Sequence, residues 1–375
     1  MKIIIVGTAY PYRGGLAAFN ERLATELQNE GDTISIETFT VQYPKLLFPG
    51  KTQYTDGEAP NLSITRSVNS VNPMNWGKVG TSIAEKNPDV VIFAYWMSFM
   101  VPCYATIAKK VKKLCNAKCI GLIHNMMPHE PSILDVILPP YFVDKMDAFF
   151  ALSDSVIHDI ERIEKDKKPK AVSPHPIYDH YGKIITRDEA LQALGLPADK
   201  QYILFFGFIR DYKGLDLLLE AMSDERIKQS NIHLLVAGEF YGNEEKYKTL
   251  TKNLNIENIT WYSHYIPDIA VNQYFCAADV IVQPYKSATQ SGVTQIGYHF
   301  EKPMIVTNVG GLPEIVPNGK IGYVVEPNGH ALADAIVAFY KEQKQEEFTA
   351  NLQEEKKKYK WNILTSRLKK LITES

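Results

Sequence analysis

Short apolar runs alternate with segments of helical periodicity along most of the chain. The run at 3–6 predicts a buried strand, and the apolar positions between 16 and 27 recur at the spacing of one helix face. Continuous apolar runs at 89–95 and 119–123 predict buried parallel strands, since strands covered on both faces need no polar alternation. Strand and helix in alternation are typical of an α/β domain with a parallel sheet.

The alternation stops at a Pro-rich segment, 173–182, and then begins again. Five later apolar runs predict the strands of a second sheet, at 202–206, 233–238, 259–262, 280–282 and 304–306. We therefore expect two α/β domains of similar size, with boundaries at 1–182 and 183–355.

Two further segments have a different pattern. The last one, 356–375, carries Trp361, Leu364, Leu368 and Leu371 on one stripe, which predicts an amphipathic terminal helix. Residues 41–75 are rich in Pro, Gly, Asn and Ser, and predict an irregular excursion between the elements of the first domain.

Two loops of the second domain have the features of an anion site. Residues 287–292 are small and polar and precede a helix, so free backbone N–H groups and the helix dipole face one point. Arg210 and Lys213 lie between a strand and a helix, where the dipole does not favour cations. A bound diphosphate explains both cations, and ordinary surface charge is the alternative.

Gly14 and Gly15 leave bare backbone at the start of the first helix, which suits either a phosphate or a flexible turn. The GxGxxG pattern is absent there, so the sequence does not support a nicotinamide-type dinucleotide site.

His124, His129 and Glu130 follow the strand at 119–123, at the end where open α/β sheets place ligands. This cluster is the best catalytic candidate in the first domain, and a structural loop histidine is the alternative. Its spacing is poor for a metal triad, because no single helix can bring all three side chains together.

Composition narrows the class of protein. Of 375 residues, 45% are hydrophobic and 22% charged, as in ordinary globular proteins. The net charge of -2 gives no attraction to nucleic acid. The four cysteines form no zinc pattern and suit a reducing compartment. The first apolar run is too short for a signal peptide or a membrane span, so we expect a cytoplasmic protein.

One surface feature leaves the membrane question open. Lys109, Lys110, Lys112 and Lys113 form the outer face of a predicted helix at 106–115, and 133–138 is strongly apolar. Solvated surface and buried core are the ordinary explanations. A peripheral contact with the cytoplasmic membrane face is the other hypothesis.

Five segments in the second half resemble one known family when taken in order. They are GFIRDYKGLDLLLEAM at 207–222, VAGE at 236–239, YIPD at 265–268, CAADVIVQPY at 276–285 and KPMIVTNVGGLPEIV at 302–316. They look like the C-terminal half of family-4 glycosyltransferases (glycosyl transferase group 1), which have the GT-B fold. In the first half, the Gly14-Gly15 loop, HN at 124–125 and SDSV at 153–156 resemble the acceptor domain of that family.

The resemblance implies two Rossmann-like domains facing a cleft, and a C-terminal helix over 356–375 that crosses back to the first domain. It implies that Arg210 and Lys213 hold the donor diphosphate. It also implies a role for each of the following residues. The rest of the diphosphate site is Gly14, Gly15, Gln290, Ser291, Gly292 and Val293; the base and ribose region is Gly238, Glu239, Tyr265, Ile266 and Gln295; and His124 faces the transferred sugar.

The chain departs from the family at two positions. Many members carry two glutamates eight residues apart, where this sequence has Ala288 and Ile296. The second glutamate usually contacts the donor ribose, so we expect a neighbour such as Gln295 to replace it.

These observations predict a hexosyltransferase-like enzyme of polysaccharide biosynthesis. It would move a sugar from a UDP- or GDP-sugar to a glycan or lipid-linked glycan, with retention of configuration and without metal or other cofactor, as the resemblance implies. Two alternatives remain: a nucleotide-sugar epimerase on the same fold, and a non-catalytic GT-B subunit that supports a partner transferase. The missing glutamates argue against the first and motivate the second.

Overall fold

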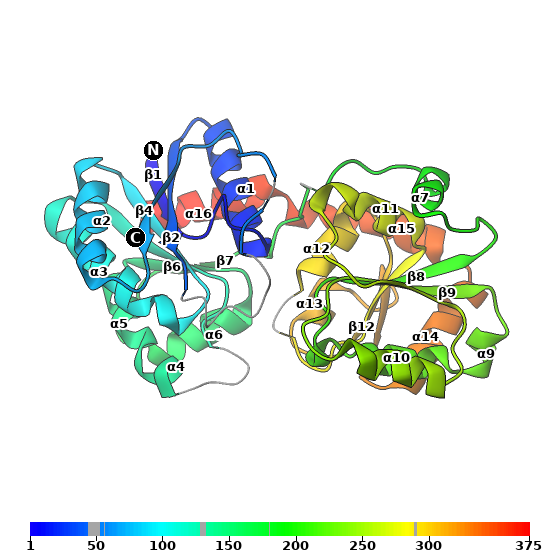
Figure 1. The fold of residues 1–375 in the computed structure, drawn as a ribbon. Helices are drawn as coiled ribbons and strands as arrows, with labels where there is room; N and C mark the ends of the chain where they lie inside the picture. The colour runs from blue at the N-terminus through cyan, green and yellow to red at the C-terminus, as the bar shows by residue number, and fades with distance from the viewer. Residues whose placement is uncertain (44–52, 56, 128–132, 180, 289–290) are drawn as a thin grey trace. The chain divides into compact units, whose positions relative to one another are not determined.

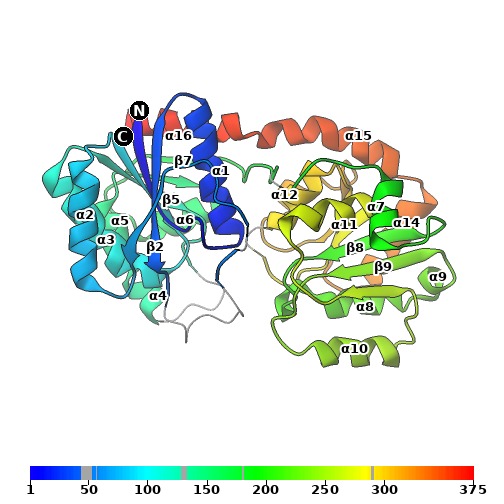
Figure 2. The same cartoon turned by 45° about the horizontal axis from the view of Figure 1, so that its top comes forward.

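The computed structural model describes residues 1–43, 53–55, 57–127, 133–179, 181–288 and 291–375 (Figures 1 and 2). The chain divides into two compact units. The first comprises Met1–Pro176 together with Tyr359–Ser375, and the second comprises Ile177–Lys358. Each is built on one parallel sheet, as the alternating pattern predicts. The boundaries expected from the sequence, 182/183 and 355/356, stay predictions.

The first unit contains a seven-stranded sheet of order β3-β2-β1-β4-β5-β6-β7. Every neighbouring pair is parallel. Its strands are β1 (Lys2–Val6), β2 (Thr33–Val41), β3 (Ile64–Asn69), β4 (Val90–Tyr95), β5 (Lys118–Ile123), β6 (Ala148–Ala151) and β7 (Lys170–Val172). The order reverses between β1 and β4, which makes the carboxyl end of this pair a topological switch point.

Helices cover both faces of this sheet. On one face lie α2 (Pro73–Glu85), η2 (Ser98–Met100), α3 (Val101–Leu114), α5 (Pro139–Lys145) and α6 (Asp154–Ile163). On the other face lie α1 (Gly15–Asn29) and α16 (Trp361–Glu374). Alternate residues of β1 point to the two sides: Ile4 belongs to the first core, and Ile3 and Ile5 belong to the second.

The terminal helix α16 is part of the first unit. Its predicted apolar stripe is buried against α1 and the sheet. At the polar edge of this contact, the Lys369 ammonium lies 2.6 Å from a Glu30 carboxylate oxygen and 2.7 Å from an Asp32 carboxylate oxygen. The stripe read from the sequence is therefore a packing face (Figure 1).

The second unit contains a six-stranded parallel sheet of order β10-β9-β8-β11-β12-β13. Its strands are β8 (Gln201–Phe206), β9 (Ile232–Ala237), β10 (Ile259–Tyr262), β11 (Val280–Gln283), β12 (Met304–Thr307) and β13 (Gly322–Val325). Here the order reverses between β8 and β11, the two central strands.

The helices of this unit also lie on both faces. One core contains side chains of α8 (Leu215–Met222), α10 (Glu244–Asn253), α14 (Gly329–Lys341) and α15 (Gln345–Glu355). On the opposite face α11 (Val271–Ala277) packs against α7 (Arg187–Leu194), and the rings of Phe275 and Phe206 have centroids 5.0 Å apart. The remaining elements are η3 (Asp211–Lys213), α9 (Glu225–Lys228), η4 (Asp268–Ala270), α12 (Gly292–His299), α13 (Leu312–Ile315) and η5 (Lys356–Tyr359).

Three details differ from the pattern read off the sequence. The segment predicted to be irregular, 41–75, contains β3 and the start of α2, and β13 was not predicted. Helix α3 begins at Val101, five residues before the predicted start. The apolar segment around 133–138 contains the short helix α4 (Ile133–Ile137), in agreement with its apolar pattern. Strand β3 lies at the edge of the sheet and fully buries only Val68, so its sequence carries almost no periodic signal.

Candidate functional site

The predicted cations lie on the turn that leaves the central strand β8. This turn runs from Gly207 to Gly214 and contains Arg210 and the short helix η3. Since β8 and β11 are the pair at which strand order reverses, the turn begins at the edge where open α/β sheets bind ligands.

Backbone contacts hold this turn against the loops from the neighbouring strands. Gly214 has φ +66°, and a Cβ atom there would lie 1.9 Å from the carbonyl oxygen of Pro284, which follows β11. Gly238, after β9, has φ +155°, and its Cβ would lie 2.0 Å from the carbonyl oxygen of Gly207. Only glycine allows such approaches. The Lys286 amide also donates to the Tyr212 carbonyl at 2.7 Å.

Lys213 is a buried cation without a counter-charge. Its side chain is 9% exposed, and its ammonium makes no hydrogen bond or ion pair with any described residue. The nearest aromatic partner is the ring of Tyr285, whose centroid lies 5.5 Å from Nζ. Burial, and then the charge of Arg210, lower the pKa of Lys213 to about 8. At neutral pH the site therefore holds a positive charge on a mostly buried side chain, which an anionic ligand would neutralise.

Arg210 is exposed, with its guanidinium carbon 4.9 Å from the ring centroid of Tyr241. Asp211, the acidic residue of the same turn, forms its ion pairs with lysines other than Lys213. Its carboxylate lies 2.7 Å from the Lys246 ammonium and 3.4 Å from that of Lys286. These contacts, led by the bond from Lys246, lower the pKa of Asp211. The carboxylate of the turn is thus used to hold neighbouring loops together.

The start of α12 presents two backbone donors. Ser291 caps the helix: its hydroxyl oxygen accepts from the Val293 amide at 3.2 Å. The amides of Ser291 and Gly292 have no hydrogen-bond partner among the residues that the structure describes. The Val293 amide is therefore already engaged, and the predicted phosphate contact rests on the other two. Gln290, also predicted at this site, lies outside the described residues.

The predicted base and ribose residues come from the strands next to β8. Gly238 and Glu239 follow β9, and the Glu239 carbonyl accepts from the Ile209 amide at 2.9 Å. Tyr265 follows β10 and stacks on Phe208, with centroids 6.4 Å apart. Ile266, next to Tyr265, is 5% exposed. Gly238, Glu239 and Tyr265 thus contact the β8 turn.

Gln295, predicted to replace the family's glutamate, is fully buried on α12. Neither its amide nitrogen nor its amide oxygen has a partner within the described part of the chain. An unsatisfied buried amide is costly, by about 1–3 kcal/mol, so this side chain is a candidate for a ligand or water contact. Its role stays a prediction.

The predicted residues of the first unit lie at the carboxyl edge of its sheet. Gly14 is the residue before α1 and Gly15 is its first residue. His124 follows β5, and its ring meets Phe19 of α1 edge-on, with centroids 4.8 Å apart. His124 Nε2 is inaccessible to solvent and has no described partner. Burial, and then His175, lower the pKa of His124 to about 3, so the ring is neutral at physiological pH.

His175 is a residue of this region that was not singled out from the sequence. It follows β7, its Nδ1 lies 2.9 Å from the Pro176 carbonyl oxygen, and its ring lies 5.2 Å from that of Phe19. Burial lowers the pKa of His175 to about 4. Its position after a strand of the parallel sheet was the available signal. His129 and Glu130 lie outside the described residues.

The described residues offer neither a metal cluster nor a membrane-spanning helix. They contain no group of three or more His, Cys, Asp or Glu residues that could hold a metal ion. The helices within the same ranges are too short or too polar to cross a membrane. The expectation that the reaction needs no metal or other cofactor stays a prediction.

The structure is that of a two-unit α/β protein with a predicted anion site on its second sheet, and comparisons with known proteins show what the chain is similar to. Residues 186–359 match the family described as Glycosyl transferases group 1. A D-inositol 3-phosphate glycosyltransferase of Streptomyces avermitilis is 27% identical over 258 residues, which are 64% of this chain and 55% of that protein. An uncharacterized glycosyltransferase of Methanocaldococcus jannaschii is 24% identical over 378 residues, covering 100% and 98% of the two chains.

Solved structures show the same fold. HepE from Anabaena, in complex with UDP-glucose, aligns over the whole of both chains with a TM-score of 0.75 and 15% identity. Sucrose-phosphate synthase from Thermosynechococcus elongatus aligns over 100% of this chain and 98% of its own, with a TM-score of 0.74 and 15% identity.

The resemblance predicted from the sequence is therefore confirmed. Residues 186–359 match the glycosyl transferases group 1 family, and the protein has the GT-B fold. The match spans 35% to 63% of the length of four D-inositol 3-phosphate glycosyltransferases.

Replacing the buried cation should have opposite effects on folding stability and on nucleotide binding. At neutral pH, lowering the pKa of Lys213 from 10.5 to about 8 corresponds to a cost of about 3 kcal/mol to the ligand-free fold. This cost is present below pH 8 and declines as pH rises towards 10.5. We expect Lys213→Met to raise the free energy of unfolding at pH 7 by about 1–3 kcal/mol, measured with urea, and to abolish calorimetric binding of UDP or GDP.

The matched control is Lys252→Met, which removes an exposed lysine from the last turn of α10. It should change the stability by less than about 0.5 kcal/mol and leave binding intact. A Lys213→Met protein that still binds the nucleotide as tightly as the wild type would contradict the assignment.

Nucleotide affinity should depend on pH through the same group. If the bound diphosphate requires protonated Lys213, affinity is constant below the free pKa of about 8 and falls about tenfold per pH unit above it. Titration calorimetry with UDP and GDP between pH 6.5 and 9.5 would measure this profile. Equal affinity at pH 7 and pH 9.5 would exclude Lys213 as the responding group.

Proposed function

We propose that the protein transfers a sugar from a UDP- or GDP-sugar to a glycan or lipid-linked glycan, with retention of configuration and without metal. The observation that carries the proposal is the buried, unpaired ammonium of Lys213, next to Arg210 on the turn after β8. A nucleoside diphosphate supplies the charge that this site lacks. The complex of HepE with UDP-glucose supports the donor class, since that protein shares the fold.

The proposed reaction breaks the bond between the anomeric carbon and the β-phosphate oxygen. Negative charge then develops on the departing nucleoside diphosphate. Lys213, Arg210 and the amides of Ser291 and Gly292 stabilise it in a desolvated site, which needs no reorganisation during the reaction. The acceptor hydroxyl forms the new bond to the same carbon, on the face that the phosphate leaves, and its proton leaves with the diphosphate.

His124 acts in this scheme as a neutral imidazole. Because its pKa is lowered to about 3, it cannot supply positive charge at physiological pH. We propose that it orients a hydroxyl of the transferred sugar through a hydrogen bond, and that Gly14 and Gly15 offer backbone to the donor.

The test is a panel of UDP- and GDP-sugars incubated with the purified chain, read as slow release of the free nucleotide. We expect hydrolysis of at least one donor, and a loss of about 100-fold or more in the double variant Arg210→Ala/Lys213→Met. Lys252→Met should keep the wild-type rate.

Other outcomes would overturn the proposal. A donor converted into its epimer without nucleotide release would indicate an epimerase. If no donor of the panel is hydrolysed and no nucleotide binds, the protein would be a non-catalytic subunit.

The lipid-linked acceptor is suggested by an apolar surface on the first unit. In α4, Ile133 is 77% exposed, Leu134 59%, Val136 60% and Ile137 52%. Asp135, on the same helix, accepts from the Ser98 hydroxyl, which holds α4 to η2. We propose that this α4 surface makes a peripheral contact with the cytoplasmic membrane face.

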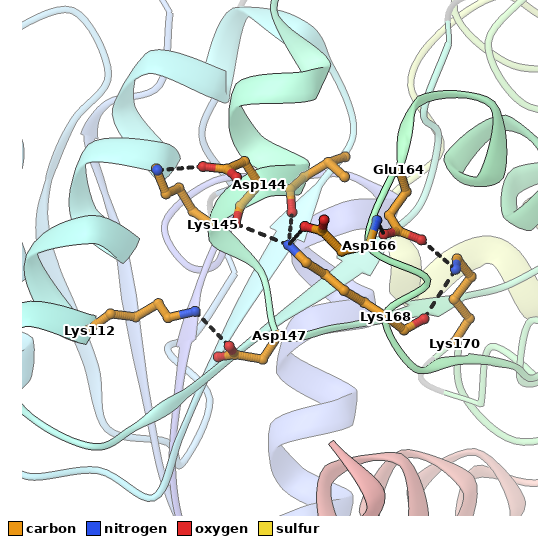
Figure 3. A network of polar contacts seen from close by, with 9 residues as sticks. Lys112, Asp144, Lys145, Asp147, Glu164, Asp166, Lys168 and Lys170 are labelled. Carbon is orange, nitrogen blue, oxygen red and sulfur yellow. Dashed lines mark hydrogen bonds and ion pairs between the residues drawn. The ribbon is translucent and has the colours of Figure 1, made fainter.

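A network of polar contacts holds the C-terminal end of the next helix, α5, against the segment that contains Lys168 (Figure 3). The Lys168 ammonium donates to the carbonyls of Val143 and Asp144, at 3.0 Å each. Lys112 and Lys145, in the same view, pair with Asp147 and Asp144. Since part of the basic face is neutralised, we expect the apolar side chains to dominate the membrane contact.

Liposome co-sedimentation tests this contact. The wild type should bind vesicles of mixed anionic and neutral lipid and retain most of that binding in 0.5 M salt, because apolar contacts are not screened. Ile133→Glu/Ile137→Glu should abolish binding. Ile269→Glu, which changes an 86% exposed isoleucine of the second unit, is the control. No sedimentation of the wild type with any vesicle would contradict the proposal.

A further inference from the structure

Tyr285 touches both parts of the anion site. It follows β11 and is 3% exposed. The centroid of its ring lies 5.5 Å from Lys213 Nζ, and its hydroxyl oxygen lies 3.2 Å from Ser291 Oγ. Its carbonyl accepts from the Thr307 hydroxyl at 2.5 Å, which fixes its backbone to β12. One side chain therefore links the cation of the β8 turn to the cap of α12.

The direction of the hydrogen bond to Ser291 follows from the count of protons. A serine hydroxyl has one proton to donate and can accept two. Ser291 donates its proton to the Gln283 side-chain oxygen at 2.6 Å and accepts from the Val293 amide. The Tyr285 hydroxyl must therefore donate. The Ser291 hydroxyl is then saturated, so a ligand at this helix end meets backbone amides.

The ring of Tyr285 is the one described group that holds the Lys213 ammonium while the site lacks an anion. An ammonium is attracted to the face of an aromatic ring, and more strongly where water is excluded. Burial raises the pKa of Tyr285, so its phenol stays neutral and does not compete with a phosphate for the cation. The ring positions the charge without neutralising it.

Backbone contacts fix the position of Tyr285 relative to the β8 turn, which contains Lys213. The Lys286 amide donates to the Tyr212 carbonyl at 2.7 Å, and Gly214 packs on the Pro284 carbonyl. The Lys286 ammonium also lies 2.7 Å from the Asp216 carboxylate on α8. The residues on both sides of Tyr285 are thus joined to the residues on both sides of Lys213.

We propose that Tyr285 is the positioning residue of the donor site. Its ring fixes the position of the Lys213 ammonium and its hydroxyl fixes the start of α12, so that both contact one phosphate group. This inference rests on the proposed function, because the phosphate is that of the nucleotide donor. Tyr285 acts through Lys213 and Ser291 and need not touch the substrate itself.

Two substitutions distinguish the contribution of the Tyr285 ring to nucleotide binding from that of its hydroxyl. Tyr285→Phe keeps the ring, so calorimetry with UDP and GDP should show about 3- to 10-fold weaker binding with the pH midpoint of affinity unchanged. Tyr285→Leu removes the aromatic face, so the midpoint should also shift down by at least half a pH unit. Tyr298→Phe, which removes another buried hydroxyl of the same domain, should change neither.

A double-mutant cycle tests the link to Ser291 without the leucine variant, whose folding is checked separately by thermal unfolding. If the hydroxyl acts through Ser291, Tyr285→Phe should have little effect on affinity in a Ser291→Ala background. Fully additive losses would overturn the link.

The results also separate this inference from the proposed function. A wild type that binds neither UDP nor GDP overturns both. Binding that depends on Lys213 but is unaffected by Tyr285→Phe and by Tyr285→Leu overturns only the role of Tyr285.

Discussion

The second unit is organised around one unfavourable interaction, the burial of the Lys213 ammonium without a counter-charge. Protein interiors tolerate charges that are paired, and this one has only an aromatic ring and a second cation near it. The nearest carboxylate in sequence, on Asp211, is held by Lys246 and Lys286 instead. The fold therefore keeps a positive charge that no carboxylate of the described residues neutralises.

The parallel sheet explains how this site is assembled. Residues after β8, β9, β10 and β11 meet at one edge because all these strands point the same way. Glycines at 214 and 238 let the loops touch backbone to backbone, which fixes the turn more firmly than side chains could. Tyr285 then joins the cation to the helix start. The predicted anion site is thus a property of several loops, and no single motif contains it.

Much of the fold and of the predicted site could be read from the sequence, and the features that could not have identifiable physical reasons. Buried parallel strands have continuous apolar runs, so β1, β4, β5 and β8 were predicted well, whereas the edge strand β3 carries too few buried residues to be recognised. The loops with Arg210, Lys213 and Ser291 were recognised from their charge, size and position. The burial of Lys213, the neutrality of His124 and the engaged Val293 amide depend on contacts between distant residues, which spacing does not encode. Tyr285 was not singled out because an aromatic residue after a strand ordinarily indicates core packing.

The most direct test of the central claim is a crystal structure of the protein with UDP or GDP bound. We expect a β-phosphate within hydrogen-bond distance of Lys213 Nζ and the amides of Ser291 and Gly292, with the Arg210 guanidinium on the same diphosphate. A nucleotide whose phosphates lie away from Lys213, with the ammonium still unpaired, would contradict it.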